Sequence, residues 1–475
     1  MTVSTTLVWF RQDLRVKDNP ALTAACDNGK IIPIYINDTS CPKKYQRGAA
    51  SNWWLHNSLK SLQKGLGGNL QLFEGDPSQI VVDLLKVYKC DAVVWNRCYE
   101  PWRTERDNDL KKQLANLGVN ATSFNGSLLW EPFDISKKDG DPYKVFTPFY
   151  KKGCLQDGAP PRYPIGTPSR ITYQKVLEKG ISLDALALLP EKRWYQTIEK
   201  NWSPGEEGAA DRLANFLTND IDNYKFARDE PSVQGTSLLS PHLHFGELSP
   251  HQVWYAVKDK YRSKQSVHVD TFLSELGWRE FNYHLHFHFP SMCHSNFNPK
   301  FNNFKWETDV SSLRAWQQGR TGIPIVDAGM RELWQTGFMH NRVRMVVASF
   351  LVKNLLIDWR KGEEWFWDCL LDADLANNNA NWQWVAGSGA DAAPYFRIFN
   401  PVLQGEKFDK HGEYVCTYCP ELAKLPPKYI HQPWSASKEV LQDAGIILGE
   451  EYPEPIVDLK TSRRRALDRY DRLTS

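Results

Sequence analysis

Tryptophan is the residue type in this chain that most invites a chemical explanation. The 475 residues include 19 tryptophans. An indole ring packs well in a core, but it can also serve as a stacking surface or an electron carrier. Each buried indole contributes a large apolar area whatever else it does, so core packing should account for most of the 19. Composition alone therefore does not show which tryptophans carry chemistry.

The segment GTSLLSP, residues 235–241, is a candidate for binding phosphate. Glycine and hydroxyl side chains here precede a proline and a helical pattern. The free amide groups of a helix start, together with nearby hydroxyls, suit an anionic phosphate. An ordinary helix N-cap uses the same residue types, so the motif on its own leaves both interpretations open.

Acidic and amide side chains gather in the run DADLANNNANWQW, residues 372–384. Taken singly, Asp372 and Asp374 are more typical of exposed carboxylates. Glu275 and Arg279 are four residues apart, and by themselves they predict only a surface ion pair worth ~0.2–0.5 kcal/mol. A wider context is needed before these side chains can be assigned a function.

Nine cysteines are scattered along the chain, and only Cys416 and Cys419 form a CxxC pair. A structural zinc or iron–sulfur site needs four ligands, and no second pair lies nearby in the sequence. The sequence therefore predicts no metal site.

The elements that must position these residues change character along the chain. From residue 6 to about residue 125, the apolar runs LVWF, IIPIYI, LQLFEG, AVVWN and ATSF alternate with helical patterns such as residues 51–66 and 77–88. This alternation is typical of a parallel sheet flanked by helices. Residues 1–130 are therefore predicted to form a doubly wound α/β domain.

The rest of the chain divides into two parts that differ in composition and apolar spacing. Residues 131–203 are rich in Pro, Gly, Lys and Tyr without a sustained period, which predicts a long interdomain linker over the surface. After Gly205 the apolar spacing becomes helical, which predicts an all-α domain over residues 204–475. The C-terminal arginines fit a solvated tail or helix face better than a nucleic-acid contact. The helical patterns cover residues 209–219, 250–261, 271–286, 313–317, 325–336 and 342–356.

Bulk properties exclude several classes of protein. The net charge is +2, so any DNA-binding site must be a local patch. The α/β part has neither a GxGxxG nor a GxxxxGK[ST] motif, so a dinucleotide or nucleoside triphosphate held in the usual way is unsupported there. No secretory signal is present, and the most apolar stretch, residues 345–359, is too short and too polar to span a bilayer. A cytoplasmic protein is expected.

Four long segments carry the most specific signal in the chain. They are WFRQDLRVKDNPAL (9–22), FLSELGWREF (272–281), GMRELWQTGFMHNRVRMVVASFLVKNLLIDW (329–359) and DADLANNNANWQWVAGSGADAAPYFRIFNP (372–401). These segments resemble the photolyase and cryptochrome family, and the resemblance covers nearly the whole chain and is highly specific. It implies a helical domain that buries a bent FAD, and it favours a photolyase of the class I or class III type that splits cyclobutane pyrimidine dimers in DNA.

By this resemblance, residues of the helical domain hold the FAD. Asn378 matches the position that faces flavin N5, where a neutral amide can both donate and accept hydrogen bonds. An aspartate at this position is typical of plant cryptochromes, whereas repair enzymes have asparagine. The other residues matched to cofactor binding are Tyr224, Thr236, Ser237, Leu238, Leu239, Ser240, Arg279, Asp372 and Asp374.

The resemblance also implies an electron-transfer chain and a lesion pocket. Trp382, Trp359 and Trp306 fall where the family conducts electrons from the protein surface to the flavin. Base-processing enzymes flip their target out of the duplex, and Glu275 would bond the flipped pyrimidine and stabilise the charge that forms on it. Arg344 is a further candidate for binding phosphate. The residues matched to the lesion or to DNA are Arg228, Glu275, Trp278, Asn341, Arg342, Met345, Trp384 and Arg397.

The antenna chromophore is the least constrained part of the assignment. Residues 95–109, WNRCYEPWRTERDND, lack the Asn-Glu pair of the best-known folate-binding photolyases. A folate, a deazaflavin, another flavin or no antenna all stay open. The WWLH segment, residues 53–56, favours methenyltetrahydrofolate by its resemblance to bacterial relatives.

Three alternatives accompany the expected repair enzyme. A cryptochrome-type blue-light photoreceptor is the main one, and Asn378 and the short C-terminal tail argue against it. A six-four photoproduct repair enzyme is expected to have paired histidines in its pocket, whereas His340 is followed by Asn341. A DNA-binding flavoprotein without repair activity is the third. The expected partner is DNA that contains cyclobutane pyrimidine dimers, with no membrane involved, and the protein is expected to be a monomer.

Overall fold

The computed structural model describes residues 4–176, 180–262, 265–392 and 396–474. The chain forms two compact units. Unit 1 consists of Met1–Asn219 and Ser237–Pro290, and unit 2 consists of Asp220–Thr236 and Ser291–Ser475.

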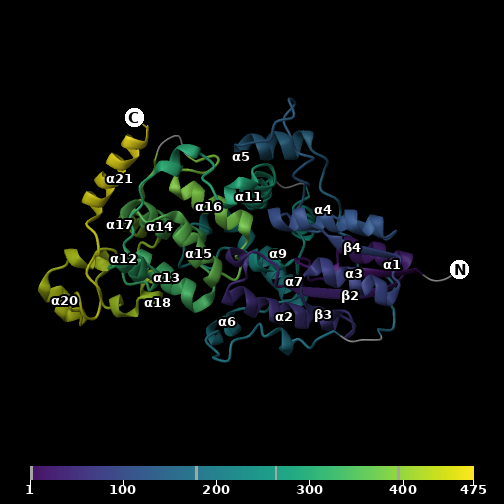
Figure 1. Ribbon diagram of the computed structural model, residues 1–475. Coiled ribbons are helices and arrows are strands. Elements are labelled where there is room, and N and C mark those ends of the chain that lie inside the picture. Colours follow the sequence, from purple (N-terminus) through teal and green to yellow (C-terminus); the bar gives the residue numbers. More distant parts are fainter. Residues whose placement is uncertain (1–3, 177–179, 263–264, 393–395, 475) are drawn as a thin grey trace. The chain divides into compact units, whose positions relative to one another are not determined.

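Unit 1 is built on a parallel sheet. Its strands are β1 (Ser4–Phe10), β2 (Gly29–Asp38), β3 (Gln71–Gly75), β4 (Ala92–Asn96), β5 (Asn120–Phe124) and β6 (Thr172–Tyr173). The strand order is β3-β2-β1-β4-β5, and the short β6 pairs with β2. Figure 1 labels β2, β3 and β4 of this sheet. In the centre, Trp9 pairs with Ile34 on one side and with Trp95 on the other. The five predicted strands are all present, which confirms the α/β prediction.

The helices between these strands cover the two faces of the sheet. The chain passes from β1 through the first two helices to β2 and then β3, towards one edge of the sheet. It then passes through the next two helices to β4 and β5, towards the other edge. Right-handed crossovers place the two helix pairs on opposite faces. One face, which includes Trp9 and Trp95, packs on the last two helices of this set. The helices are α1 (Pro20–Asn28), α2 (Ala49–Gly65), α3 (Pro77–Tyr88) and α4 (Pro101–Asn116).

Several helices beyond residue 204 also belong to unit 1. The predicted helical domain begins at residue 204, but the chain remains in unit 1 as far as Asn219 and returns to it for Ser237–Pro290. Ser249 caps one of these helices by accepting from Gln252 N, and the Gln252 side chain accepts from Ser249 N in return. The helices are α7 (Glu206–Asn215), α9 (Ser240–Phe245), α10 (Pro250–Lys260) and α11 (Val267–His288).

The segment predicted to be a linker contains a packed helix. α5 (Phe146–Pro148) continues into the π-helical η2 (Phe149–Asp157), which packs on α11 (Figure 1). Phe149, Tyr150 and Cys154 are buried. The expectation of a surface linker is therefore wrong for residues 146–157, because aromatic side chains bury one face of a helix that the surrounding Pro and Gly obscure. Other short elements of unit 1 are η1 (Lys43–Tyr45), η3 (Asp184–Leu186) and α6 (Gln196–Asn201).

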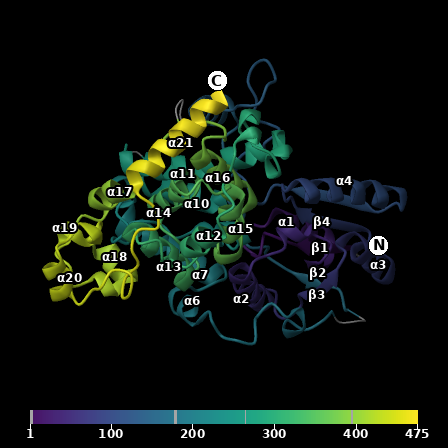
Figure 2. The same ribbon diagram turned by 60° about the vertical axis from the view of Figure 1, so that its left-hand side comes forward.

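Unit 2 is helical around one large apolar core (Figure 2). The predicted helix over residues 342–356 is divided, because α14 ends at Ser349 and the chain continues as the π-turn η8. The core helices and turns are η7 (Pro299–Asn303), α12 (Val310–Gln317), α13 (Pro324–Thr336), α14 (Asn341–Ser349), η8 (Phe350–Asn354), α15 (Trp359–Cys369) and α16 (Leu375–Ala386). Preceding or bounding them are η4 (Phe216–Asp220), η5 (Ile221–Asn223), α8 (Tyr224–Ala227) and η6 (Pro290–Cys293).

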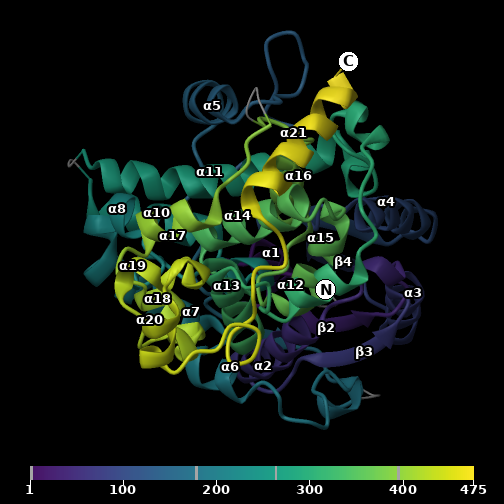
Figure 3. The ribbon, with the colours of Figure 1, turned by 90° about the vertical axis from the view of Figure 1, so that its left-hand side faces the viewer.

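The arginine-rich C-terminal segment is a helix, α21 (Leu459–Thr474), that packs on η7 and η8 (Figure 3). Ala466 is completely buried in this contact. Arg465 Nη2 donates to the carbonyl of Asn354 at 2.8 Å, and Arg469 Nη2 lies 2.6 Å from Glu307 Oε1. The sequence predicted that these arginines lie in a solvated tail or on a helix face, and the structure shows the helix face. The other elements here are α17 (Pro401–Phe408), α18 (Glu413–Tyr418), η9 (Pro420–Leu422), α19 (Pro427–Ile430), η10 (Pro433–Ser435) and α20 (Lys438–Ala444).

Across the described residues, none of the helices combines the length and the apolar character that crossing a membrane requires.

Candidate functional site

Asn378 lies in the first turn of α16, and its side chain is held in place. Asp374 caps this helix by accepting from Asn377 N at 2.9 Å and from Asn377 Nδ2 at 2.7 Å. Asn378 is 9% exposed, and its Nδ2 donates to the carbonyl of Glu363 on α15 at 3.1 Å. This bond leaves the amide oxygen as the atom that can accept from a ligand N–H. The arrangement fits a ring nitrogen of a reduced flavin.

A row of buried amides continues along α16, and the sequence did not single it out. Asn379 Nδ2 donates to Glu363 Oε1 at 2.7 Å, and Gln383 Nε2 donates to Asn379 Oδ1 at 3.1 Å. Gln383 also donates to the carbonyl of Met292 at 3.0 Å and accepts from Phe297 N at 2.7 Å. The four-residue spacing of Asn379 and Gln383, which places both on one helix face, was the available signal.

The acidic pair has two different roles in the structure. Asp372 forms an ion pair with Arg344, whose Nη2 lies 3.0 Å from Asp372 Oδ2. Arg344 Nε also donates to the carbonyl of Met339 at 2.7 Å. Asp374 is the N-cap described above. The guanidinium of Arg344 is thus engaged within unit 2, which weakens its expected role as a phosphate contact.

The three tryptophans matched to electron transfer belong to one apolar cluster. Trp382 and Trp359 are 3% and 0% exposed and lie in the core of unit 2, and the partly buried Trp306 packs against that core. Trp306 also contacts Phe304, with ring centroids 4.4 Å apart. Burial therefore decreases from the first two indoles to the third, as a path from interior to surface requires.

Each of the two inner indoles is fixed by a specific contact. Trp359 Nε1 donates to Asn296 Oδ1 at 2.9 Å. Trp382 packs edge-on against Phe366, with centroids 5.0 Å apart. At Gly362 of α15, an added Cβ would lie 2.1 Å from the Trp382 ring. Only glycine therefore allows α15 to approach the indole so closely.

The start of α14 carries three residues matched to the lesion. Asn341 is exposed, while Arg342 and Met345 are half-buried. Arg342 Nη2 lies 2.7 Å from Asp229 Oδ1, its guanidinium carbon lies 4.4 Å from the centre of the Phe408 ring, and its Nη1 lies 3.8 Å from Met345 Sδ. These contacts orient the guanidinium and leave it partly exposed.

The residue before Asn341 is anchored in a buried polar network. His340 caps α14 through its Nδ1, which accepts from Arg342 N at 3.3 Å. Glu332 Oε2 accepts from His340 N at 3.1 Å and from the Tyr414 hydroxyl at 2.6 Å. Burial raises the pKa of Glu332 to about 7 and lowers the pKa of His340 to about 4. The network fixes where α14 begins, and so where Asn341 is presented.

Three further residues of unit 2 lie among those matched to the lesion or to DNA. The guanidinium carbon of Arg228 lies 5.5 Å from the centre of the Tyr224 ring. Trp384 Nε1 donates to the carbonyl of Asp391 at 3.2 Å. Arg397 is exposed, and its carbonyl accepts from the buried Lys353 Nζ at 2.7 Å. Lys353 thus holds the main chain beneath an exposed arginine.

The candidate phosphate loop divides between the two units. Tyr224 and Thr236 belong to unit 2, and residues 237–240 belong to unit 1. Leu238 has a φ of +52°, a left-handed conformation that is uncommon for a residue other than glycine. Leu239 N donates to Ser237 Oγ at 3.4 Å. Strain of this kind concentrates at ligand sites, which agrees with a ligand-binding loop.

In unit 1, α11 presents Glu275, Trp278 and Arg279, all half-buried. Arg279 Nη1 donates to Glu280 Oε1 and to the carbonyl of Ser127, both at 2.9 Å. Burial raises the pKa of Glu280 to about 7. Arg279 thus has a buried acidic partner that the sequence did not identify, and its second bond, to the Ser127 carbonyl, ties it to the main chain of unit 1.

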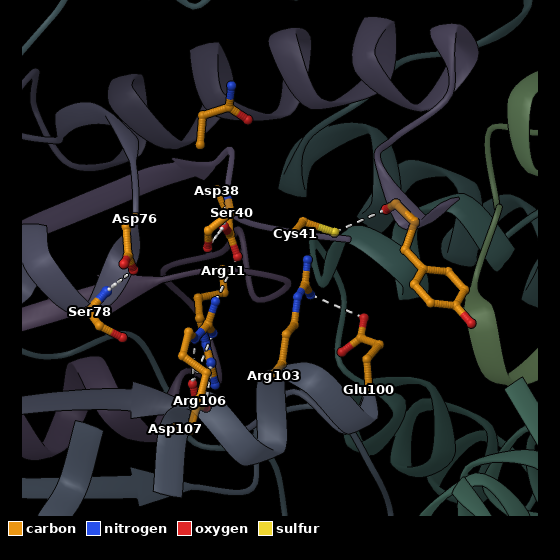
Figure 4. Close-up of polar contacts among 12 residues, drawn as sticks. Arg11, Asp38, Ser40, Cys41, Asp76, Ser78, Glu100, Arg103, Arg106 and Asp107 are labelled. Carbon is orange, nitrogen blue, oxygen red and sulfur yellow. Dashed lines mark hydrogen bonds and ion pairs between the residues drawn. The ribbon is translucent and has the colours of Figure 1, made fainter. Parts of the chain in front are cut away.

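The carboxyl edge of the sheet is filled by ion pairs (Figure 4). Strand order reverses between β1 and β4, which is the usual place for a ligand in an open α/β sheet. Arg11 Nη1 lies 2.6 Å from Asp107 Oδ2, and Arg106 Nη1 lies 2.7 Å from Asp38 Oδ2. An anionic ligand at this edge would have to compete with carboxylates already in place.

The WWLH segment belongs to the core of unit 1. Trp53 and Trp54 of α2 are 2% and 0% exposed. Trp54 Nε1 donates to Glu247 Oε1 at 3.0 Å. The structure therefore shows that the tryptophans of this segment have a packing role. The antenna assignment stays a prediction.

Cys416 and Cys419 lie at the end of α18, and all nine cysteines are free thiols. In the part of the chain that the structure describes, no group of three or more His, Cys, Asp or Glu side chains is arranged to hold a metal ion.

Comparison with known proteins links both parts of the chain to one family. The family model for DNA photolyase matches residues 6–164, and the model for the FAD binding domain of DNA photolyase matches residues 272–472. The deoxyribodipyrimidine photo-lyase of Agrobacterium fabrum is 50% identical over 469 residues, which are 98% of this chain and 97% of that protein. Cryptochrome-2 of Arabidopsis thaliana is 40% identical over 96% of this chain and 77% of that protein. The crystal structure of a bacterial class III photolyase from Agrobacterium tumefaciens matches with a TM-score of 0.96 and 49% identity, covering 100% of this chain and 98% of that one.

Proposed function

Because this chain belongs to the DNA photolyase family, we propose that it is a light-driven enzyme that repairs cyclobutane pyrimidine dimers in DNA. Its activity is that of a deoxyribodipyrimidine photo-lyase. When bound and reduced, FAD supplies the photoexcited electron that splits the dimer. The residues of this chain bind and orient the reactants, exclude water and hold the nearby charges in place.

The observation that carries the proposal is Asn378. Its side chain is buried and donates to the carbonyl of Glu363, so a neutral amide oxygen is presented at the position matched to flavin N5. A neutral group does not repel a reduced, anionic ring, whereas a carboxylate would. This favours a repair enzyme over the photoreceptor type that has aspartate here.

The proposed FAD site uses side chains that other contacts already orient. Asp372 is fixed by Arg344, and Asp374 is fixed as the helix cap. Arg279 is held by Glu280 and by the Ser127 carbonyl. The remaining proposed contacts with the cofactor are Tyr224, Thr236, Ser237, Leu238, Leu239 and Ser240.

Oxidised cofactor is proposed to be re-reduced through Trp382, Trp359 and Trp306. The two buried indoles, Trp382 and Trp359, and the partly buried Trp306 support a route from the core towards the surface of unit 2. The hydrogen bond from Trp359 to Asn296 holds the middle indole in one orientation.

Two sets of residues are proposed to bind the lesion and its strand. Glu275 bonds the pyrimidine edge and stabilises the charge that develops on it, and Trp278 offers an aromatic face. Asn341, Met345 and Trp384 contact the lesion, and Arg228, Arg342 and Arg397 bind phosphates. Because phosphate contacts release counterions, affinity for damaged DNA should fall steeply with salt. Affinity that does not change with salt would contradict this assignment.

We also propose methenyltetrahydrofolate as the antenna, and a monomer that works in the cytoplasm. The nine free thiols agree with a reducing compartment. The absorption spectrum of the purified protein, followed by identification of the chromophores released on denaturation, tests the antenna. Sedimentation tests the oligomeric state.

Illumination of the purified, reduced protein with oligonucleotides that contain one defined lesion tests the main proposal. One set of samples carries a cyclobutane dimer and another a six-four photoproduct, and each has a dark control. We expect light-dependent loss of the cyclobutane dimer alone. Loss of the six-four photoproduct would identify the other repair class. Dimer binding without repair would point to a flavoprotein that only binds DNA. If neither lesion is bound or lost, the photoreceptor alternative suggested by the Arabidopsis relative becomes the better one.

A further inference from the structure

Three aromatic rings of unit 1 form a near-parallel stack that ends on Trp278. Phe146 of α5 lies against Trp278 of α11, with ring centroids 3.8 Å apart and an interplanar angle of 10°. Tyr150 of η2 lies against Phe146, with centroids 5.5 Å apart and an angle of 9°. One face of the half-buried Trp278 indole is therefore covered by protein.

The surroundings impose this geometry. Aromatic pairs usually prefer an offset or edge-on arrangement with centroids 4.5–7 Å apart, so a parallel contact at 3.8 Å needs support. Phe281 gives it by packing edge-on against both rings, at 6.0 Å and 67° from Phe146 and at 5.8 Å and 74° from Trp278. Gly277 leaves the space for Tyr150, because an added Cβ would lie 2.5 Å from that ring.

The stack connects two distant parts of the sequence. Phe146 and Tyr150 come from the segment 146–157, which the sequence predicted to be a linker, and both are 8% exposed. Because Phe146 occupies one face of Trp278, a ligand that stacks on this indole must use the opposite face.

We propose that Phe146 is a positioning residue of the lesion site, which fixes the plane of Trp278 so that the face opposite Phe146 receives the flipped pyrimidine dimer. The inference rests on the proposed function, in which Trp278 contacts the lesion. A ring that is already fixed in its bound orientation loses less rotamer freedom when the lesion binds, so the complex is tighter. Undamaged DNA does not place a base on Trp278 and does not benefit.

Replacement of Phe146 in the full-length, FAD-containing protein tests the inference. Phe146→Met keeps a long apolar side chain but removes the flat ring, and Phe146→Tyr keeps the ring. Phe149→Leu is the matched control, because Phe149 is also buried in this segment and packs on Phe281 and Tyr143. Affinity for an oligonucleotide with one cyclobutane dimer, affinity for the undamaged oligonucleotide, repair rate at saturating DNA and melting temperature are measured for each.

We expect Phe146→Met to weaken dimer binding by about tenfold, equivalent to about 1.4 kcal/mol, with little change for undamaged DNA or for the repair rate at saturation. Phe146→Tyr should restore dimer binding to within about twofold. Phe149→Leu should lower the melting temperature without this selective loss. In combination with Trp278→Phe, the effect of Phe146→Met should be smaller than it is alone, because the two rings act together.

Unchanged dimer affinity in Phe146→Met would overturn the inference while repair by the unmodified protein upholds the proposed function. An equal loss in Phe149→Leu, or additive effects in the double variant, would also overturn it by showing a general packing effect. If Phe146→Met does not fold, Phe146→Leu replaces it, alone and in combination with Trp278→Phe. The same comparisons of dimer affinity, together with Phe146→Tyr, then test the inference. If the unmodified protein neither binds nor repairs dimers, the proposed function fails and this inference fails with it.

Discussion

Unit 1 and unit 2 bury polar side chains of different kinds. In unit 1 the fully buried Arg15 donates to the carbonyls of Asp18, Gly246 and Gly126, at 2.6–3.0 Å. In unit 2, neutral amides such as Asn296 and Gln383 hold Trp359 and the face of α16, although the Arg360 guanidinium carbon also lies 4.6 Å from the centre of the Trp359 ring and Asn379 bonds the buried Glu363 carboxylate. The first network is centred on one buried cation, whereas in the second the hydrogen bonds to Trp359 and along α16 come mainly from amides.

The difference corresponds to what each region has to do. A buried guanidinium has five donors and can tie several loop carbonyls together, which suits a rigid scaffold. A fixed charge in a low-dielectric core would strongly stabilise or destabilise a charge that moves along the tryptophans. Amides can orient an indole without this effect. The following experiments test the contrast between the buried cation of unit 1 and the amide-held indole of unit 2.

The largest effect is expected from Arg15→Met. This change leaves three carbonyl groups without their donor, so the free energy of unfolding should fall by about 3 kcal/mol or more. Thermal melting of the full-length protein measures it. Arg193→Met is the control, since Arg193 pairs with Glu199 at the surface, and its melting temperature should stay unchanged. A comparable loss in both variants would remove the distinction between a scaffold arginine and a surface arginine.

Trp306→Phe should slow the light-driven reduction of oxidised FAD by about tenfold or more, a barrier increase of about 1.4 kcal/mol. Repair by enzyme that was reduced beforehand should continue. Absorbance during illumination follows the reduction. Trp194→Phe, which changes an exposed indole of unit 1, should reduce normally. Equal photoreduction in Trp306→Phe and in the unmodified protein would contradict the assigned route.

Asn378→Asp should lower the rate of repair by about tenfold, because a carboxylate repels the reduced, anionic ring. Repair of a dimer-containing oligonucleotide is followed under steady illumination. Asn381→Asp introduces the same charge at an exposed position of α16 and should have little effect. Equal repair rates in the two variants would show that the charge at position 378 is unimportant.

A pH-dependent effect, small within any one pH unit, is expected from Lys353, a buried lysine of unit 2. Burial, and then the nearby Arg397, lower the pKa of Lys353 to about 7. Between this value and the ordinary pKa of lysine the unfolded chain keeps a proton that the folded chain has lost, so stability from this group rises with pH by at most about 1.4 kcal/mol per unit. Lys353→Met should remove that rise. Melting temperatures at pH 7 to 9 compare the variants, and parallel curves would refute the prediction.

Much of the fold could be predicted because single elements follow local rules. The bounds of α3 agree with the sequence pattern, since Asp76 caps the helix and a proline begins it. The strands follow from apolar runs between turns. By contrast, the change from α14 to η8 could not be predicted, because five residues of π-helix do not disturb an apolar pattern enough to be recognised.

The candidate site was predictable only where a motif carries it. Asn378, Trp359 and Trp382 were found through the resemblance, and their contacts then explained their orientation. The roles of Phe146 and Glu280 depend on contacts with residues far away in the sequence, so no local pattern reveals them. Their assigned functions, like those of all the site residues, stay predictions until the variants are measured.

Gly362 is a position that tolerates no side chain. The position touches neither cofactor nor DNA in the proposed function, yet any side chain there would collide with Trp382. A substitution would have to move α15 away from Trp382, and so would widen a gap that the proposed electron transfer crosses. In a survey of natural variants, damage at this position should therefore show itself first as a loss of photosensitivity, before any loss of DNA binding.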